Sequence, residues 1–147
     1  MTIRELIPFR GKHLDQFTIQ AAQAEEVVIV LGLDLSDIKR MEASDAVTAL
    51  RDGWVLGCAG TAPIEGTETH AAWLLMGRAV NRADLLWITR QIRTILSMPT
   101  YDRIVTTVRS DFTEGHRWAR MLGFSPSGPL KYQQHDHTVY VKENPSW

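Results

Sequence analysis

Hydrophobic and polar positions in the first third of the chain change from alternation to helical spacing. TIRELIP alternates and is stopped by Pro8, which predicts a first strand. GKHLDQFTIQAAQAEE then places apolar residues at the three- and four-residue spacing of a helix. VVIVLGLDL fits either a continued helix or a strand, and Ser36 is placed to cap a short helix over DIKRMEA. This part of the chain therefore predicts a strand followed by two helices.

The middle of the chain predicts a hairpin, a buried strand and a long helix. In AVTALRDGWVLGCAGTA, Asp52-Gly53 separates two strand-like runs and is the best local hairpin signal in the chain. After the polar loop PIEGTETH, AAWLLMG is a short, wholly apolar run typical of a strand in the middle of a sheet. ADLLWITRQIRTILSM predicts an amphipathic helix that Pro99 ends. The apolar face of this helix is formed by Leu85, Ile88, Ile92 and Ile95.

The last third predicts a strand, a helix and a terminal hairpin. RIVTTV is rich in β-branched residues, as strands are. Asp111 and Glu114 have the spacing of a capping box and open a helix over FTEGHRWARML, which Gly123 closes. LKYQQ and HTVYVKE are expected to form two antiparallel strands joined at His135-Asp136. The order of elements predicts an α+β domain with a mostly antiparallel sheet and a central strand–helix–strand–helix unit.

The composition favours a soluble globular protein without a nucleic-acid or membrane partner. Of the 147 residues, 44% are hydrophobic and 22% are charged, and the net charge is −1. A local basic patch remains open, although a solvated helix face is the simpler interpretation. The arginines concerned are Arg78, Arg82, Arg90, Arg93, Arg103 and Arg109.

The single cysteine, the charges near the N-terminus and the shortness of the apolar runs indicate a cytoplasmic protein. Cys58 cannot form an internal disulfide, and its apolar neighbours favour a buried strand thiol over a nucleophile. Charges interrupt the apolar run at the N-terminus, so we expect no signal peptide. The uncharged apolar runs are too short to span a bilayer.

The element order and the passage VRSDFTEGHRWARMLGF resemble the GNAT superfamily of acyl-CoA-dependent N-acetyltransferases. The cue is a strand, a short helix and a closing Gly123-Phe124, and the likeness is specific from about Trp54 to Tyr140. It implies one GNAT-like domain over residues 1–147 with helices on both faces of the sheet. It also implies acetyl-CoA as co-substrate, with the pantetheine arm in a gap where the strand before the long helix splays from its neighbour.

The loop that opens the long helix is similar to the family's diphosphate-binding pattern, Q/R-x-x-G-x-G/A. Residues 78–83 fit this pattern with Asn81 in the first glycine's place, and asparagine tolerates left-handed backbone. Free amides and the dipole at a helix start attract phosphate, and Arg78 and Arg82 would add charge. Alternatively, Asn81 caps the helix with Asp84 as its reciprocal partner, and Asp84 would repel a phosphate. The expected cofactor contacts are Leu75, Met76, Gly77, Arg78, Ala79, Val80, Asn81, Arg82 and Ala83.

The sequence departs from the family at two positions of the last helix. Many members place a tyrosine four residues before the closing glycine, where it protonates the leaving thiolate, but this chain has Ala119 there. The family's frequent asparagine early in the helix falls on Phe112. Tyr132 or Tyr140, on the expected terminal hairpin, could substitute for the tyrosine, or could serve packing alone.

A transferase of this type also needs a group that removes a proton from its amine. The candidates are Glu65, Glu68 and His70 around the start of the buried strand, and His116 in the last helix. Each of these could instead be an ordinary surface or packed residue. The expected catalytic residues are Glu68, His70 and Tyr132. We expect no metal, because the two histidines of residues 135–137 have no cluster of further ligands nearby in the sequence.

Within the superfamily, the chain looks most like small GNAT-like proteins of bacteriophages, including internal virion proteins of short-tailed coliphages. WLLMGRAVNRADLLWITRQIR and WARMLGF carry this likeness. Two functions follow from it. The first is acetyl transfer from acetyl-CoA to a small-molecule or protein amine. The second is a catalytically degenerate GNAT scaffold that acts as a virion component or binding module, in which case a virion or host-cytoplasm location and a homodimer or virion partner are expected.

Overall fold

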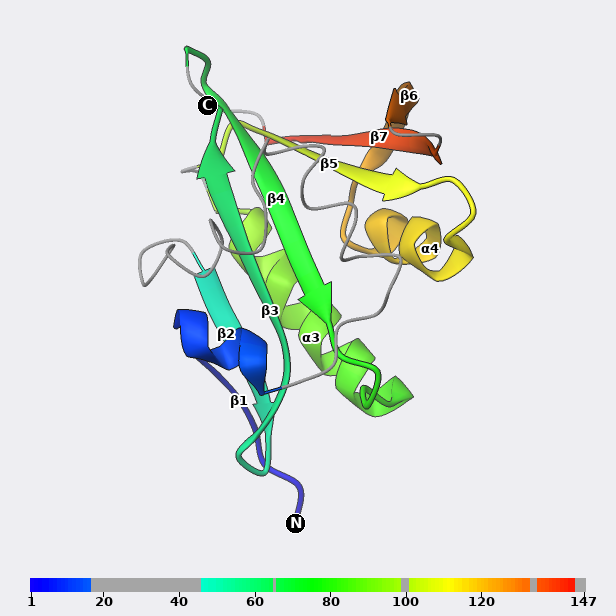
Figure 1. Cartoon of the computed structure of the whole chain (residues 1–147). Helices are drawn as coiled ribbons and strands as arrows, with labels where there is room; N and C mark the ends of the chain where they lie inside the picture. The colour runs from blue at the N-terminus through cyan, green and yellow to red at the C-terminus, as the bar shows by residue number, and fades with distance from the viewer. Residues whose placement is uncertain (17–45, 65, 99–100, 133–134, 145–147) are drawn as a thin grey trace.

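The computed structural model describes most of the chain, as drawn in Figure 1. The two helices and the ambiguous run that the sequence predicts between residues 11 and 43 lie almost entirely outside the described residues, as does Pro99. The described residues are 1–16, 46–64, 66–98, 101–132 and 135–144.

A seven-stranded sheet in the order β1-β2-β3-β4-β5-β7-β6 forms the centre of the described structure. All neighbouring strands pair antiparallel except β4 and β5, which are parallel. The α+β class and the mostly antiparallel sheet expected from the sequence are therefore confirmed. The strands are β1 (Arg4–Pro8), β2 (Ala46–Arg51), β3 (Trp54–Pro63), β4 (Thr69–Met76), β5 (Arg103–Arg109), β6 (Ser125–Tyr132) and β7 (His135–Glu143).

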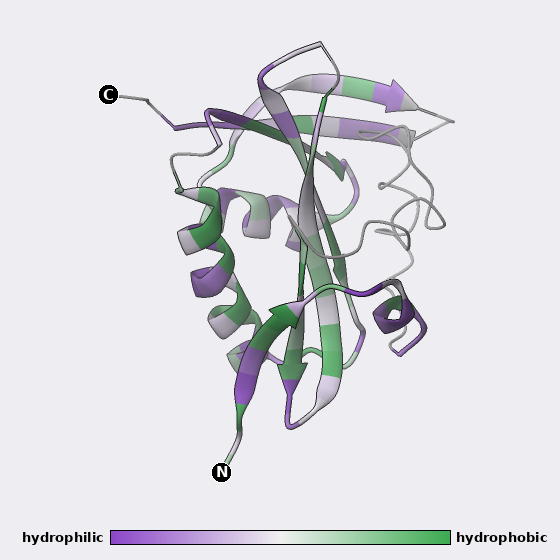
Figure 2. Cartoon of the chain, turned by 90° about the vertical axis from the view of Figure 1, so that its left-hand side faces the viewer, coloured by the Kyte–Doolittle hydropathy of each residue, from purple (hydrophilic) through white to green (hydrophobic). Residues whose placement is uncertain are grey.

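The described helices cover both faces of this sheet. The α-helices α3 (Arg82–Leu96) and α4 (Thr113–Met121) lie on one face, and the short 3-10 helix η1 (Gly11–Asp15) lies on the other (Figure 2). The Trp118 indole of α4 donates a hydrogen bond to the Thr89 hydroxyl of α3 at 2.7 Å, which ties the two α-helices together.

Each face of the sheet has its own hydrophobic cluster. The larger cluster joins the sheet to α3 and α4, as the apolar stripe of α3 predicts. The smaller cluster packs beneath η1. The larger cluster includes Leu56, Met76, Ile88, Ile92, Leu96, Ile104, Trp118, Ala119 and Tyr140. The smaller cluster comprises Phe9, Leu14, Ala46, Cys58, Trp73 and Leu75.

The hairpin expected at Asp52-Gly53 connects β2 to β3. Asp52 has φ 49° and Gly53 has φ 84°, so both central residues are left-handed, as a type I′ hairpin turn requires. Asp52 also accepts a hydrogen bond from the Ile3 N–H at 2.8 Å, which ties the turn to the residues just before β1. β4 lies in the middle of the sheet, as the wholly apolar run AAWLLMG indicated.

Two local expectations in the last third of the chain are wrong. α4 is not opened by a capping box at Asp111, because its N-cap is Phe112, without a side-chain cap. The Asp111 carboxylate instead accepts two hydrogen bonds from Arg109, at 2.7 and 3.0 Å. The hairpin join is not at His135-Asp136, because both residues already belong to β7 and pair with β6.

None of the helices in the described part of the chain is long and apolar enough to cross a membrane.

Candidate functional site

β4 and β5 are paired at one end only. Their parallel pairing consists of Thr69 with Arg103, His70 with Ile104, and Ala71 with Val105. One residue further along, the Thr106 hydroxyl of β5 donates a hydrogen bond to the Ala72 carbonyl of β4 at 3.1 Å. Beyond that contact the two strands take widely different directions (Figure 1).

The far half of β4 therefore turns part of its backbone toward the diverging β5. Gly77, just after β4, donates its N–H to the Leu56 carbonyl of β3 at 2.8 Å. Backbone groups alternate in direction along a strand, so Leu75 also faces β3 whereas Leu74 faces away from it. Leu74 is thus the residue of β4 best placed to bond an extended ligand. Leu75 was expected to contact the cofactor, but its side chain is fully buried in the cluster beneath η1.

The turn after β4 ends in a capping box. The Asn81 side chain accepts a hydrogen bond from the Asp84 N–H at 2.8 Å, and the Asp84 carboxylate accepts one from the Asn81 N–H at 3.0 Å. The cap interpretation of Asn81 is confirmed. The next two amides, those of Arg82 and Ala83, have no acceptor among the described residues, as expected for the first positions of a helix. These amides remain able to bind an anion.

Asp84 carries a buried charge at this helix start. Its side chain is fully buried, and it forms ion pairs with Arg4 of β1, whose Nε lies 2.9 Å from Oδ1, and with Arg51 of β2. The exposed Arg78 and Arg82 lie in the same turn. Asp84 alone would repel an anion, but Arg4 and Arg51 pair with its carboxylate, and Arg78 and Arg82 add positive charge in the same turn.

The expected catalytic residues are not brought together. Glu68 is exposed in the loop before β4. His70 lies at the paired end of β4 and β5, where its ring packs edge-on against Tyr101 with ring centroids 5.2 Å apart, and its buried Nδ1 has no hydrogen-bond partner among the described residues. Tyr132 ends the edge strand β6, which β5 and β7 separate from β4, and its side chain lies outside the described structure. Glu65 also lies outside it.

The structure joins two residues that the sequence presented separately. His116 of α4 and Tyr140 of β7 form a hydrogen bond of 2.9 Å between Nδ1 and the phenol oxygen. The other ring nitrogen, Nε2, lies 3.1 Å from the Ser110 carbonyl, which can only accept. A neutral His116 therefore carries its proton on Nε2 and accepts the Tyr140 hydroxyl proton at Nδ1. Sequence spacing could not reveal this contact, because it depends on how α4 packs against β7.

Tyr140 lies close to the point where β4 and β5 separate. It is the direct cross-strand partner of Thr106, whose hydroxyl reaches Ala72. Directly opposite residues point their side chains to the same face of a sheet. The hydroxyl of Thr106, the phenol of Tyr140 and the ring of His116 thus form a polar group on the α4 side of the divergence.

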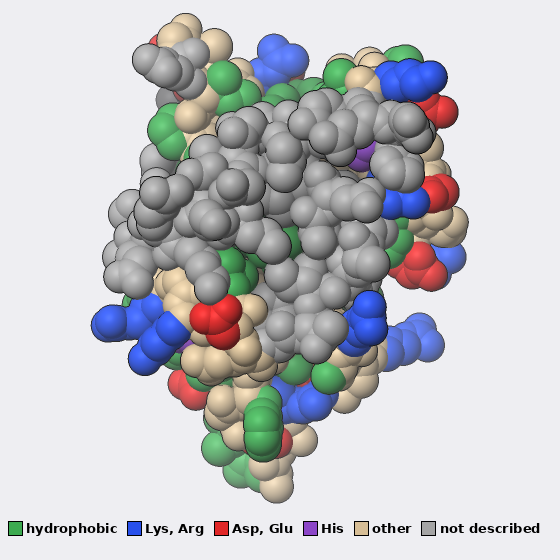
Figure 3. Space-filling model, viewed as in Figure 1, with side chains coloured by type: hydrophobic (Ala, Val, Ile, Leu, Met, Phe, Trp, Pro, Cys, Tyr) green, Lys and Arg blue, Asp and Glu red, His purple; other side chains and the backbone are tan. Residues whose placement is uncertain are grey.

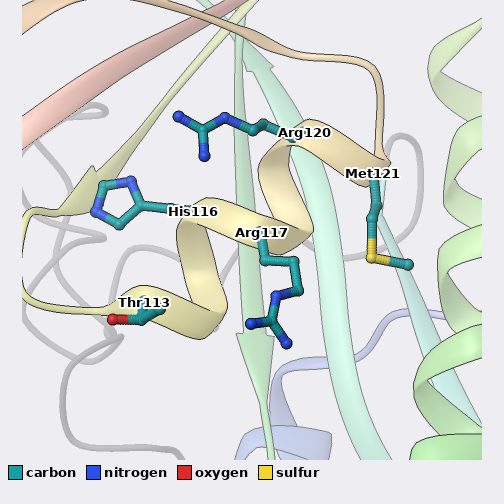
Figure 4. Close-up of a pocket in the computed structure, with 5 residues that line it drawn as sticks. All are labelled: Thr113, His116, Arg117, Arg120 and Met121. Atoms are coloured by element: carbon teal, nitrogen blue, oxygen red, sulfur yellow. The ribbon is translucent and has the colours of Figure 1, made fainter.

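A pocket of about 610 Å³ is open along α4 (Figure 4). Arg117 and Arg120 are exposed there, and neither has an ion-pair partner among the described residues, so the pocket favours anions. In the view of Figure 3, Lys and Arg side chains are visible at several points around the residues that are not described. The pocket is lined by Thr113, His116, Arg117, Arg120 and Met121.

Cys58 has neighbours that resemble those of a nucleophile, but its thiol is not activated. Its Sγ lies 3.5 Å from the Thr48 hydroxyl, which in turn lies 2.7 Å from the His13 Nδ1. Burial nevertheless raises the pKa of the thiol to about 12, although the hydrogen bond with Thr48 acts in the opposite direction. The expectation of a buried strand thiol is therefore confirmed. No group of three possible metal-ligating side chains is found among the described residues.

The chain shares its fold with acetyltransferases of the GNAT family. No protein-family model and no curated protein matches its sequence. It is similar in structure to a GNAT-family acetyltransferase from Bacillus anthracis, with a TM-score of 0.66, 10% identity, and coverage of 95% of this chain and 94% of that one. It is also similar to a GNAT-family acetyltransferase from Streptococcus pneumoniae (TM-score 0.65, 12% identity, coverage of 97% and 100%).

A third similar structure contains a ligand. It is yncA from Salmonella typhimurium with its cofactor acetyl-CoA, at a TM-score of 0.67 and 10% identity, with coverage of 98% of this chain and 95% of that one. At these identities the similarity establishes the fold, and any activity of this chain has to be argued from its own residues.

Proposed function

We propose that this protein is a GNAT-type N-acetyltransferase that transfers an acetyl group from acetyl-CoA to an amine. The observation that carries the proposal is the divergence of β4 from β5 beside a helix start with free amides. An extended arm that ends in a diphosphate needs both features in this order: a strand edge to lie against and an anion site at its end. The similar structures, one of which holds acetyl-CoA, support the same ligand.

The direction of β4 supports one orientation of the cofactor. Its pantetheine arm would lie beside Leu74, whose backbone faces the divergence, and its diphosphate would lie on residues 78–83. The amides of Arg82 and Ala83 would donate to phosphate oxygens, and the guanidinium of Arg78 would add charge. Of the contacts expected from the sequence, the buried Leu75 side chain is the least able to take part directly.

The reaction itself needs no covalent intermediate on the protein. The amine nitrogen would attack the thioester carbonyl, and the carbon–sulfur bond would then break, leaving an amide and the thiolate of CoA. One proton must leave the amine and one must reach the sulfur. Glu68 and His70 remain the candidates for the first step. Tyr132 and Tyr140 remain the candidates for the second; the phenol of Tyr140 lies near the divergence, but its hydroxyl must turn from His116 to donate to the sulfur.

Ligand binding tests the proposal before any acceptor is known. Acetyl-CoA should raise the melting temperature and change the tryptophan fluorescence, since a ligand at 100 times its Kd stabilises the folded state by about 2.7 kcal/mol. Arg78→Glu should weaken binding strongly, because it reverses a charge in the proposed diphosphate site. Arg90→Glu reverses the charge of an exposed residue in the middle of α3 and should bind like the wild type. Equal affinity of both variants would move the diphosphate site elsewhere.

The second candidate function is a GNAT scaffold without chemistry. Ala119 is buried in the core where many members have a tyrosine, and Phe112 replaces the frequent asparagine, which favours this alternative. A wild-type protein that shows no thermal shift at millimolar acetyl-CoA would refute the transferase and leave the binding module. A wild-type protein that binds acetyl-CoA would instead make the acyl acceptor the next question.

A further inference from the structure

A single carboxylate, that of Asp84, links the start of α3 to strands β1 and β2. Asp84 is fully buried, and its two oxygens accept from Arg4 of β1, from Arg51 of β2 and from the N–H of Asn81. Arg4 is 80 residues away from Asp84 in the sequence and Arg51 is 33 residues away. A surface cap has no need of two arginines, because Asn81 and Asp84 already complete the capping box between themselves.

The two arginines depend on Asp84 as much as Asp84 depends on them. Arg4 and Arg51 are direct cross-strand partners in the β1–β2 pair. Like charges in such a pair repel each other, and their side chains are only 21% and 27% exposed, so water screens them incompletely. A carboxylate that contacts both removes this repulsion. The pairing therefore holds the β1–β2 pair, the end of the turn and the start of α3 in one fixed arrangement.

We propose that Arg4, Asp84 and Arg51 form a positioning clamp for the diphosphate turn. The clamp rests on the proposed function, since it fixes residues 78–83 in the conformation that presents the amides of Arg82 and Ala83 to an anion. Asp84 touches no ligand in this arrangement. It acts by holding the turn in place, and the two arginines that it binds neutralise the negative charge that would otherwise repel a diphosphate.

The clamp is testable, because repulsion by the Asp84 charge and positioning of the turn by Asp84 predict opposite changes in CoA affinity when Asp84 is neutralised. Asp84→Asn keeps the size of the side chain and removes one negative charge from a site proposed to bind a diphosphate. If the charge of Asp84 mattered only by repulsion, the variant would bind CoA more tightly. If Asp84 positions the turn, the variant loses its hold on both guanidinium groups and should bind CoA at least about tenfold more weakly, the effect typical of losing an outer support.

The experiment is a titration of CoA into the wild type, Asp84→Asn and a matched control, at a temperature where all three are folded. The control is Asn144→Ala, because Asn144 ties the opposite end of α3 by donating to the carbonyls of Leu96 and Tyr101, at 2.6 and 2.7 Å. Asn144→Ala should lower the melting temperature and leave the Kd for CoA unchanged. Asp84→Asn should lower the melting temperature and raise the Kd.

A second pair of variants keeps the inference testable if Asp84→Asn does not fold. Arg51→Lys keeps the charge beside Asp84 and loses only the guanidinium fork, whereas Arg51→Met loses both. We expect affinity for CoA to fall in the order wild type, Arg51→Lys, Arg51→Met. Unchanged or tighter binding by folded Asp84→Asn, or equal binding by the two Arg51 variants, would overturn the clamp while the proposed function stands. A wild type that does not bind CoA would reject the proposed function together with the clamp that depends on it.

Discussion

Raising the pH above 9 should destabilise the folded protein through its single cysteine. Cys58 lies in β3 with 2% of its surface exposed, beneath η1 and beside the hydroxyl of Thr48. Burial disfavours the thiolate and raises the pKa of Cys58 from 9.0 to about 12 in the folded state. In the unfolded chain the same thiol is solvated and has its ordinary pKa. The two states therefore bind different numbers of protons over this range of pH.

The sign and size of the effect follow from that difference. Well below pH 9 the thiol is neutral in both states, so Cys58 adds no pH dependence to the free energy of unfolding. Between pH 9 and 12 the unfolded chain releases a proton that the folded chain retains, so the free energy of unfolding falls by about 1.4 kcal/mol per pH unit. At pH 10.5 the expected loss is about 2 kcal/mol, a substantial part of the about 5–15 kcal/mol that stabilises an ordinary domain.

Chemical denaturation of the wild type and of Cys58→Ser would isolate this contribution. Serine keeps a hydroxyl beside Thr48 and does not ionise below pH 12, so any constant cost of the substitution appears equally at every pH. Other groups that titrate at high pH also appear equally in both proteins. The difference in free energy of unfolding between the two proteins should be constant from pH 7 to 8 and should then move by about 2 kcal/mol in favour of the serine variant by pH 10.5.

Two outcomes would refute the reasoning. A difference between the wild type and Cys58→Ser that stays constant from pH 7 to 10.5 would mean that the folded thiol ionises as readily as the unfolded one. Rapid reaction of the native wild type with a thiol reagent at pH 8, without unfolding, would mean that the thiol is not buried as the structure has it.

Three further predictions concern packing and the helix cap. Gly57→Ala should lower the free energy of unfolding by about 1–3 kcal/mol, because the new Cβ would lie 2.5 Å from the Leu75 carbonyl oxygen. Gly128→Ala is the control, since its Cβ would meet nothing within 4 Å, and equal denaturation midpoints for the two variants would contradict the prediction. Asn81→Ala should cost about 1 kcal/mol through loss of the α3 cap, and Asn81→Asp should restore it in the same denaturation assay. Trp118→Phe should lower the free energy of unfolding by at least about 1 kcal/mol, because it removes the indole N–H that bonds Thr89. An unchanged melting temperature would mean that this hydrogen bond does not stabilise the fold.

The parts of the fold that the sequence predicted correctly are those that depend on neighbouring residues. The turn at Asp52-Gly53 needs two left-handed residues, and both residue types supply them locally. The apolar run AAWLLM of β4 and the apolar stripe of α3 require only a buried environment. The capping box at Asp111 was wrong for an equally local reason, since Arg109 two residues earlier binds the same carboxylate that would have capped α4.

Only those contacts of the candidate site that join residues close together in the sequence could be predicted. Asn81 and Asp84, which form the cap, are three positions apart, so the cap could be read from the spacing. The ion pair between Asp84 and Arg4 joins residues 80 positions apart, so no pattern along the chain contains it. The same holds for Tyr140 and His116, 24 positions apart, which meet because α4 packs over β7.

A capped helix start and an anion site at the same helix start are compatible in this protein, because they use different amides. The capping box occupies the N–H groups of Asn81 and Asp84, the first and last of the four residues at the corner. The N–H groups of Arg82 and Ala83 lie between them, and a helix has no internal acceptor for either. The carboxylate that closes the box would normally weaken an anion site, but here two arginines from β1 and β2 neutralise it from behind. The cap therefore limits where a diphosphate could bind, to the two central amides and the exposed arginines beside them, without preventing binding.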